Sequence, residues 1–301
     1  MDSELARLVS DLSDLYLYPQ IEYAVRSNGK RLRPILVLLA AQNVGGNRDN
    51  FVSLALAFEL MHTATLIHDD IIDQDGVRRG RLALHKKWSV NDAILTGDAL
   101  IALSINLASK YGERIIDTVS KCGLELCEGE HIDVNSVLKT ATEESYFKMI
   151  KRKTASLFRD AAFCGALAGG ATTSEALSFS NYGENFGIAY QLKDDLLDIG
   201  FSTESIPSLK AQRISLPLIH LYEKSDLGRR RQLEKSLFAG EQGCGNVFAE
   251  KVGRMLLQSD SIAYCKKKLG EYMQKTFDSI KPLKDNDYKS YLVQMIDFLV
   301  M

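Results

Sequence analysis

Apolar residues recur at three- and four-residue steps along most of this chain, the spacing of one face of an α-helix. The segment 51–73 shows the pattern clearly, with apolar side chains from Phe51 through Phe58 to Met61. We predict a helix there, with Asn50 as its N-cap. No stretch alternates between apolar and polar residues convincingly enough to predict a half-buried strand.

The same spacing predicts a succession of further helices. They cover the ranges 3–16, 20–28, 31–43, 90–110, 113–135, 143–170, 174–200, 212–223, 227–238, 246–277 and 285–299. Breaks are predicted at Gly45–Asn47, at Gly76 and over Gly240–Gly245. Helices joined by short loops, without strands, predict an all-α fold built as one large helical bundle over residues 1–301.

Composition narrows the class of protein. With 46% apolar residues the chain can form a sizeable core, and its net charge of −2 gives no basic field for nucleic acid. No run approaches the roughly 20 apolar residues that a membrane span needs. The N-terminus lacks the layout of a signal peptide, and the five cysteines form no C-x-x-C pair. These features predict a cytoplasmic protein with reduced thiols.

Two aspartate clusters of the same form, D-D-x-x-D, begin at Asp69 and Asp194, 125 positions apart. Each follows an apolar run. Positions i and i+4 share a helix face, so Asp69 pairs with Asp73 and Asp194 pairs with Asp198. The middle aspartate of each cluster lies about 100° round the helix, at the edge of that face.

Carboxylates on apolar helices repel each other unless a cation neutralises them. Hard oxygen ligands favour Mg²⁺, which binds one or two carboxylates together with substrate phosphates. Two such helices facing each other would hold several Mg²⁺ ions and a polyphosphate. The alternative for either cluster alone is a solvated acidic patch. An EF-hand is excluded because its calcium-loop pattern is missing.

Basic residues that could complete a diphosphate site occur in three segments. They are Gly29–Pro34, residues 78–80 and Lys151–Thr154. Arginine and lysine are the usual phosphate partners. Each segment alone is more often a solvated helix face, but with two acidic clusters they favour diphosphate binding.

In this order the motifs resemble those of the trans-isoprenyl diphosphate synthases, from about residue 20 to residue 300. The segments are GKRLRP (29–34), HDDIIDQDGVRRG (68–80), GD (97–98), GEHID (129–133), KTA (153–155) and YQLKDDLLD (190–198). The resemblance implies a single α-helical domain around a deep central cavity, in a homodimer. It also implies head-to-tail condensation of isopentenyl diphosphate with an allylic diphosphate.

The resemblance implies roles for individual residues. The Mg²⁺ ligands would be Asp69, Asp73 and Asp194, supported by Asp70, Asp195 and Asp198. The allylic diphosphate would contact Arg78, Lys153, Thr154, Gln191 and Lys193. Isopentenyl diphosphate would contact Lys30, Arg33, His62 and Arg79. The first two groups, without Lys193, would carry the catalysis, with three Mg²⁺ per active site and Mn²⁺ as a substitute.

Product length should depend on the helix before Asp69, along which the cavity would run. In the family an aromatic residue four or five positions before the first aspartate ends the cavity early. Here Ala64 and Thr65 are small, and the next side chains that could close it are Met61 and Phe58. The sequence therefore predicts a product longer than farnesyl, of C20 or more.

The segment after Asp198 departs from the family pattern. It is about five residues short, its loop lysine is missing and Ser208 stands where an aspartate is expected. Arg213 and Ser215 replace a lysine and a threonine. These departures leave open a weakly active or regulatory diphosphate-binding subunit of a heteromeric synthase. A terpene cyclase is a third option, but it would lack the basic set for isopentenyl diphosphate.

Overall fold

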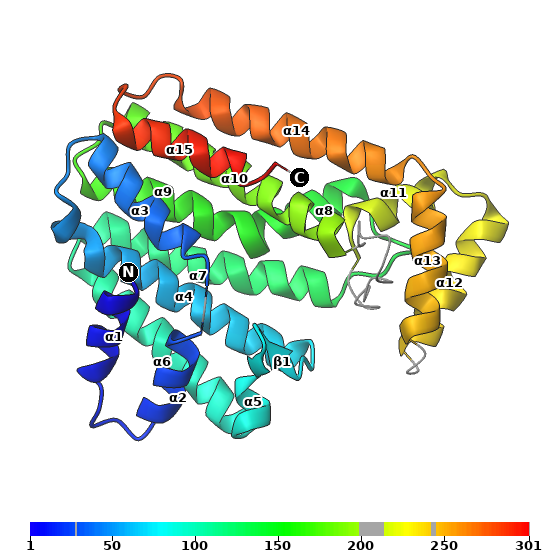
Figure 1. Cartoon of the computed structure of the whole chain (residues 1–301), viewed down its shortest axis with the longest axis horizontal. Coiled ribbons are helices and arrows are strands. Elements are labelled where there is room, and N and C mark those ends of the chain that lie inside the picture. The colour runs from blue at the N-terminus through cyan, green and yellow to red at the C-terminus, as the bar shows by residue number, and fades with distance from the viewer. Residues whose placement is uncertain (28, 199–213, 242–244, 301) are drawn as a thin grey trace. The chain divides into compact units, whose positions relative to one another are not determined.

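The computed structural model describes residues 1–27, 29–198, 214–241 and 245–300, the side chains of 237–250 excepted. Helices dominate this part of the chain (Figure 1), which confirms the predicted all-α class. The chain divides into two compact units, described separately below. Unit 1 comprises Met1–Leu124, Leu157–Gly183 and Pro282–Val293, and unit 2 comprises Glu125–Ser156, Glu184–Lys281 and Gln294–Met301.

The elements follow one another with short connections. Those that begin in unit 1 are α1 (Asp2–Ser10), α2 (Tyr18–Val25), α3 (Leu32–Asn43), α4 (Val52–Ile72), β1 (Val77–Arg78), β2 (Arg81–Leu82), α5 (Leu84–Lys87), α6 (Val90–Ser109), α7 (Glu113–Val134), α10 (Thr173–Asp198) and α15 (Asp287–Asp297). Those that begin in unit 2 are α8 (Glu143–Ile150), α9 (Ser156–Ala168), α11 (Leu216–Lys224), α12 (Leu227–Glu241), α13 (Gly245–Leu257) and α14 (Ser261–Ile280). The unit boundaries fall inside α7, α10 and α15 and at the first residue of α9.

Helix α4 forms the centre of unit 1. It packs along α6 and also contacts α2 and α3. Nearly every residue from Leu54 to Ala64 is buried, which is expected of a helix that is apolar on all sides. By length and composition alone α4 and α6 could cross a membrane. The apolar stretch of α4, which includes the turn before it, is 67% buried inside the fold, so packing accounts for its composition.

Side-chain caps explain two helix starts that the sequence located well. The Ser89 hydroxyl accepts a hydrogen bond from the Asp92 N–H at 3.0 Å, and α6 begins at the next residue. The hydroxyl of Thr142 accepts from the Ser145 N–H, while the Ser145 hydroxyl accepts from the Thr142 N–H. This reciprocal capping box starts α8.

Several predicted boundaries are wrong. Asn50 is not the N-cap of α4, because it lies inside a 3₁₀ turn (Arg48–Phe51) that Asn47 caps. The helix predicted over 3–16 ends at Ser10, and the break predicted at Gly240 comes later, since α12 continues to Glu241. The helix predicted over 246–277 is two helices. The Ser259 hydroxyl accepts from the Ser261 N–H, a local bond that competes with the helix.

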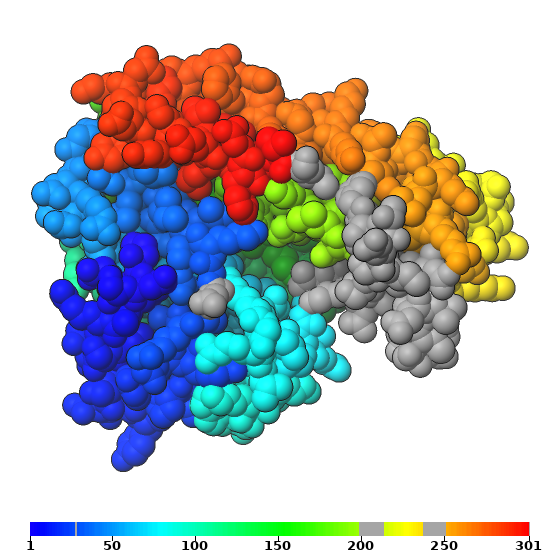
Figure 2. All heavy atoms as spheres, viewed as in Figure 1, coloured from blue at the N-terminus to red at the C-terminus, as the bar shows by residue number. Residues whose placement is uncertain are grey.

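A two-stranded hairpin that the sequence did not predict follows the first aspartate cluster. Val77 pairs with Leu82 and Arg78 with Arg81. The two turn residues, Arg79 and Gly80, have φ of 52° and 75°, as a tight hairpin turn requires. The hairpin belongs to the cyan segment at the surface of unit 1 in Figure 2. Strands of two residues are too short to show an alternating pattern.

The helix predicted over 143–170 is interrupted by one π-helical turn, Lys151–Ala155, between α8 and α9. Such turns widen the helix and often occur at functional sites. This turn contains Lys153 and Thr154, two of the predicted substrate contacts. A periodic apolar pattern cannot reveal it, because the helix direction is kept on both sides.

Candidate active site

The first aspartate cluster lies at the end of α4, in unit 1. Asp69 and Asp70 are in its last turn, and Asp73 is the residue that follows it. The Asp73 N–H donates to the Asp69 carbonyl at 2.8 Å, so the helical spacing continues through the whole motif. Asp69 and Asp73 are half-buried, whereas Asp70 is buried.

The second cluster occupies the last turn of α10, in unit 2. Asp194 is half-buried, Asp198 is exposed and Asp195 is buried. Within the described helices α4 and α10, no basic residue lies in the last turn. The carboxyl end of a helix carries a partial negative charge, so carboxylates there are unfavourable without a cation. Both clusters consequently need positive charge from outside their own helix.

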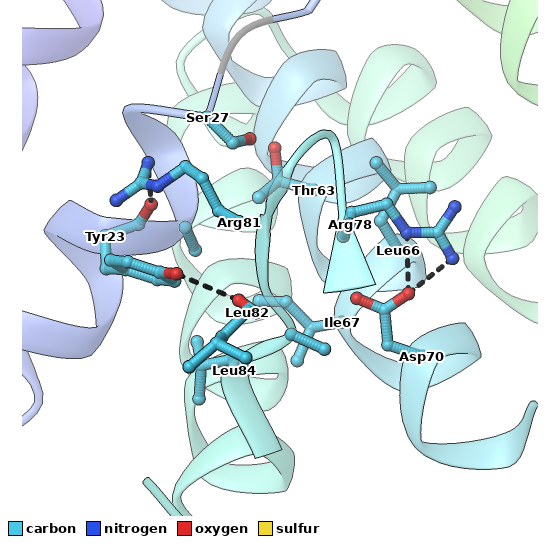
Figure 3. A pocket seen from close by; sticks show the side chains of 12 residues that line it. Tyr23, Ser27, Thr63, Leu66, Ile67, Asp70, Arg78, Arg81, Leu82 and Leu84 are labelled. Atoms are coloured by element: carbon cyan, nitrogen blue, oxygen red, sulfur yellow. Dashed lines mark hydrogen bonds and ion pairs between the residues drawn. The ribbon is translucent and has the colours of Figure 1, made fainter. Parts of the chain in front are cut away.

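The middle aspartate of the first cluster has an arginine partner. The Arg78 side chain, on β1, donates to Asp70 through Nε at 2.6 Å and through a second guanidinium nitrogen (Figure 3). Arg78 also reaches Asp75 at 3.3 Å. Burial raises the pKa of Asp70, and Arg78 opposes that shift. Asp70 thus anchors the hairpin to α4, while Asp69 and Asp73 are placed nearer the solvent.

The middle aspartate of the second cluster is held by neutral donors. The hydroxyl of Tyr146, on α8, donates to one oxygen of Asp195 at 2.6 Å. The Gln191 amide donates to the other at 2.8 Å and accepts from the Thr154 hydroxyl at 2.8 Å. Burial raises the pKa of Asp195 to about 6, although both hydrogen bonds favour its ionised form. The structure thereby joins Thr154, Gln191 and Asp195, three of the predicted site residues.

Lys153 is held by acidic residues of α7. Its ammonium lies 2.5 Å from an Asp133 oxygen and 2.6 Å from a Glu130 oxygen. Gly129 allows the close approach, since a Cβ there would lie 2.3 Å from the main-chain nitrogen of Lys153. The GEHID segment therefore positions the lysine. Sequence reasoning had quoted the segment without giving these acids a role.

Cationic side chains surround His62 in unit 1. Burial and the nearby charges of Arg33, Arg79, Arg31 and Arg78 lower the pKa of His62 well below its ordinary value. A neutral imidazole among four arginines marks a region of positive potential, suited to a multiply charged anion. The guanidinium of Arg33 also lies over the Phe158 ring at 4.2 Å, a contact that fixes its plane.

Backbone strain concentrates in the same region. Arg31 and Arg79 have φ of 51° and 52°, a conformation that side-chain-bearing residues rarely adopt. Gly29 lies against Arg79, since a Cβ at Gly29 would fall 2.7 Å from its guanidinium. Residues in such conformations persist only where the surroundings hold them, and they cluster at functional sites.

Arg31 and Glu59 are a supporting pair that sequence reasoning missed. Arg31 donates to the buried carboxylate of Glu59, to Asp2 at 3.0 Å, and to the carbonyls of Val25 and Ser27. This network fixes the loop that carries Lys30 and Arg33. A signal was present, because a glutamate inside the apolar run of α4 requires a cationic partner.

A small cavity of about 40 Å³ lies behind Asp70 and Arg78 in unit 1. Figure 3 shows its mainly apolar lining, including Leu66, Ile67 and Leu84. Its volume is close to that of a single water molecule, so it cannot hold a prenyl diphosphate.

The acidic residues fit Mg²⁺ as a guest that arrives with its substrate. In the described part of the chain, no group of three or more Asp, Glu, His or Cys side chains is arranged to hold a metal. Mg²⁺ does not need one, because it uses one or two carboxylates, several waters and substrate phosphates. Half-buried oxygen ligands at helix ends without a basic residue meet that requirement.

The motifs and the fold can be compared with those of known proteins. The sequence profile described as polyprenyl synthetase matches residues 15–250, a span that contains both aspartate clusters. The chain belongs to the polyprenyl synthetase family. The geranylgeranyl diphosphate synthase of Methanosarcina mazei is 34% identical to it over 94% of this chain and 89% of its own. The geranylfarnesyl diphosphate synthase of the same organism is 38% identical over 79% of each chain.

Solved structures of the family have the same fold. The polyprenyl synthase of Caulobacter crescentus is 28% identical and superposes with a TM-score of 0.88, over 99% of this chain and 93% of its own. The predicted family and the enzyme class, a trans-prenyltransferase of the head-to-tail type, are therefore confirmed. A terpene cyclase is not supported.

Two sets of predicted residues in this polyprenyl synthetase are placed differently from the core of the site. Lys193 donates to the carbonyls of Phe298 and Val300 at 2.7 Å and 3.2 Å, so its ammonium is directed to the C-terminal segment. Ser208, Lys210 and Arg213 lie outside the described residues.

The predicted chain-length residues all lie on α4 of the synthetase. Ala64, Met61 and Phe58 are fully buried, whereas Thr65 is half-buried. The end of the Met61 side chain faces Gly123 of α7, where an added Cβ would meet it at 3.8 Å.

Proposed function

We propose that the protein condenses isopentenyl diphosphate with an allylic diphosphate to form a trans-prenyl diphosphate of C20 or longer. The observation that carries the proposal is the pair of carboxylate clusters at two helix ends, without a basic residue in either last turn. The relatives support it, since they include geranylgeranyl, geranylfarnesyl and octaprenyl diphosphate synthases. The Caulobacter crescentus structure was solved with calcium and isoprenyl diphosphate.

Asp69, Asp73 and Asp194 are the proposed Mg²⁺ ligands, with Asp198 beside them. Mg²⁺ bound there would neutralise the charge that develops on the leaving diphosphate. Asp70 and Asp195 support these ligands from behind, because protein donors already occupy their carboxylates.

The cationic residues form two proposed diphosphate sets. The set for isopentenyl diphosphate is Lys30, Arg33, His62 and Arg79, and the set for the allylic diphosphate is Arg78, Lys153, Thr154 and Gln191. The first set lies in unit 1 with its strained backbone and its four arginines. Lys193 is left out of the second set because of its bonds to the C-terminal segment.

The proposed reaction needs no nucleophilic side chain. The allylic C–O bond breaks, and its electron pair leaves with diphosphate. The double bond of isopentenyl diphosphate attacks the allylic cation, and the released diphosphate takes up the proton that is lost. Lys153 and Arg78 would stabilise the leaving group's charge. Apolar walls would keep water away from the cation.

The purified protein should elongate C5, C10 or C15 allylic primers with isopentenyl diphosphate when Mg²⁺ is present. EDTA should lower the rate at least about a hundredfold, since the metal supplies several kcal/mol of charge stabilisation. Chromatography of the dephosphorylated products measures both effects. Restoring Mg²⁺ in excess is the control. No elongation from any primer would contradict the proposal and favour the regulatory subunit.

We also propose a homodimer that forms through α6. Ile94 and Leu95 are 42% and 53% exposed on this helix, and only 39% of its apolar stretch is buried in the fold. Contiguous exposed apolar surface of this kind is typical of an interface. A second copy of the chain is the proposed occupant.

The exchange Leu95→Asp should convert the dimer into a monomer, because it places a charge in the apolar interface. Sedimentation velocity measures the state. Leu177→Asp on α10 is the matched control, since Leu177 is also 53% exposed. If the wild type sediments as a monomer, or Leu95→Asp stays dimeric, this interface is wrong.

A cytoplasmic location remains a proposal. The four described cysteines, 122, 127, 164 and 265, are free thiols. Free thiols are expected in a reducing compartment.

A further inference from the structure

Tyr146 has no assigned role, yet it makes the shortest hydrogen bond to the second aspartate cluster. Its side chain is 3% exposed, and its hydroxyl donates to Asp195 at 2.6 Å. The ring packs edge-on against Phe147, which in turn stacks on Tyr272 of α14. The hydroxyl therefore points at Asp195 from a ring that cannot easily turn.

Three consecutive hydrogen bonds start from this hydroxyl. Tyr146 and Gln191 each donate to one oxygen of Asp195, and Thr154 donates to the Gln191 carbonyl. They connect α8, the last turns of α10 and the π-helical turn within unit 2. Thr154 and Asp195 are buried, so water cannot readily replace a lost partner.

The direction of these bonds fixes how Gln191 and Thr154 face a ligand. Because an Asp195 oxygen takes an N–H of Gln191, the amide must turn its oxygen toward Thr154. The Thr154 hydroxyl is thereby committed as a donor to that oxygen. One N–H of Gln191 and the lone pairs of the Thr154 oxygen are then presented in a set orientation. Tyr146 holds the carboxylate on which this orientation depends.

The two clusters use their middle aspartate in the same way. Asp70 is buried and bound by Arg78, and Asp195 is buried and bound by Tyr146 and Gln191. In both cases the protein occupies the carboxylate, whereas the outer aspartates remain half-buried or exposed. The middle aspartate is suited to anchoring in each motif.

We infer that Tyr146 is a positioning residue for the allylic half of the reaction, acting through Asp195 on Gln191 and Thr154. The inference rests on the proposed function, which assigns these last two residues to the allylic diphosphate. It separates them from the isopentenyl set, which Tyr146 does not contact. A purely structural role would affect stability and leave the balance between the two substrates unchanged.

The test is Tyr146→Phe, which removes one oxygen and keeps the ring. It should raise the KM of the allylic primer, or lower kcat, by about ten- to a hundredfold, the range for losing one buried hydrogen bond to a charged acceptor. The KM of isopentenyl diphosphate should stay within about twofold. Steady-state kinetics with each substrate varied in turn measures the split.

Tyr182→Phe is the matched control. Tyr182 is also fully buried, and its hydroxyl donates at 2.7 Å to the Leu292 carbonyl in unit 1. This variant should lose a similar amount of thermal stability with unchanged kinetics. If Tyr146→Phe behaves as Tyr182→Phe does, or changes both KM values equally, Tyr146 only fills the core.

Calorimetric binding of inorganic diphosphate with Mg²⁺ distinguishes this inference from the proposed function. If the wild type elongates no primer, the proposed function fails. The inference still predicts about tenfold weaker diphosphate binding by Tyr146→Phe than by the wild type. Equal binding by the wild type, Tyr146→Phe and Tyr182→Phe would overturn it.

Discussion

Replacing Asp69 with asparagine is expected to lower kcat by about 10²- to 10³-fold, the range seen when one charge-stabilising group is removed from an active site. Asp69 lies in the last turn of α4, half-buried, with the middle aspartate behind it bound by Arg78. The exchange keeps the size of the side chain but removes the charge that attracts Mg²⁺. Asparagine leaves one neutral oxygen, which is a weaker ligand for a hard cation.

Asp117→Asn is the matched control for this change. Asp117 is 55% exposed on α7, where it pairs with Lys121 at 2.8 Å. An exposed pair of this kind contributes little to stability, so turnover should stay within about twofold. Raising the Mg²⁺ concentration should partly restore Asp69→Asn if the loss is one of metal affinity. A variant with wild-type turnover at low Mg²⁺ would remove Asp69 from the metal site.

Helical periodicity predicted most of the helices because burial sets it. A helix surrounded by neighbours, such as α4, is apolar on every side, and a capped helix such as α6 shows its start in a single serine. Periodicity could not predict the hairpin at Arg78 and Arg79. Two-residue strands carry no pattern, and the turn places an arginine at positive φ where glycine or asparagine is usual.

The division of labour inside each motif was also beyond the sequence. Helical spacing separates the middle aspartate from the outer two by angle alone, and does not say which side is buried. That depends on groups far along the chain: Tyr146 lies 49 positions before Asp195, and Arg78 comes from a hairpin that was not predicted. Glu59 was within reach of sequence reasoning, since a carboxylate within an apolar run requires a partner.

The exchange Ala64→Phe is expected to shorten the product by at least one isoprene unit. The proposed cavity runs along α4 from Asp69 toward its start, and a ring five residues before Asp69 would lie about 7.5 Å along the axis. Residue 64 is fully buried, so the new ring must also displace neighbours at a cost of about 1–3 kcal/mol. Product chromatography and the melting temperature should be measured together.

Ala55→Phe separates the effect on chain length from the cost of overpacking. Ala55 is as fully buried as Ala64 and lies nine residues nearer the start of the same helix, about 13 Å away. This control should lose stability and keep the wild-type product, because Phe58 and Met61 stand between it and the diphosphate end. Two outcomes contradict the placement: an unchanged product from Ala64→Phe, or equal shortening by both variants. Either would mean that another helix sets the length, and that the small side chains before Asp69 serve only the packing of α4.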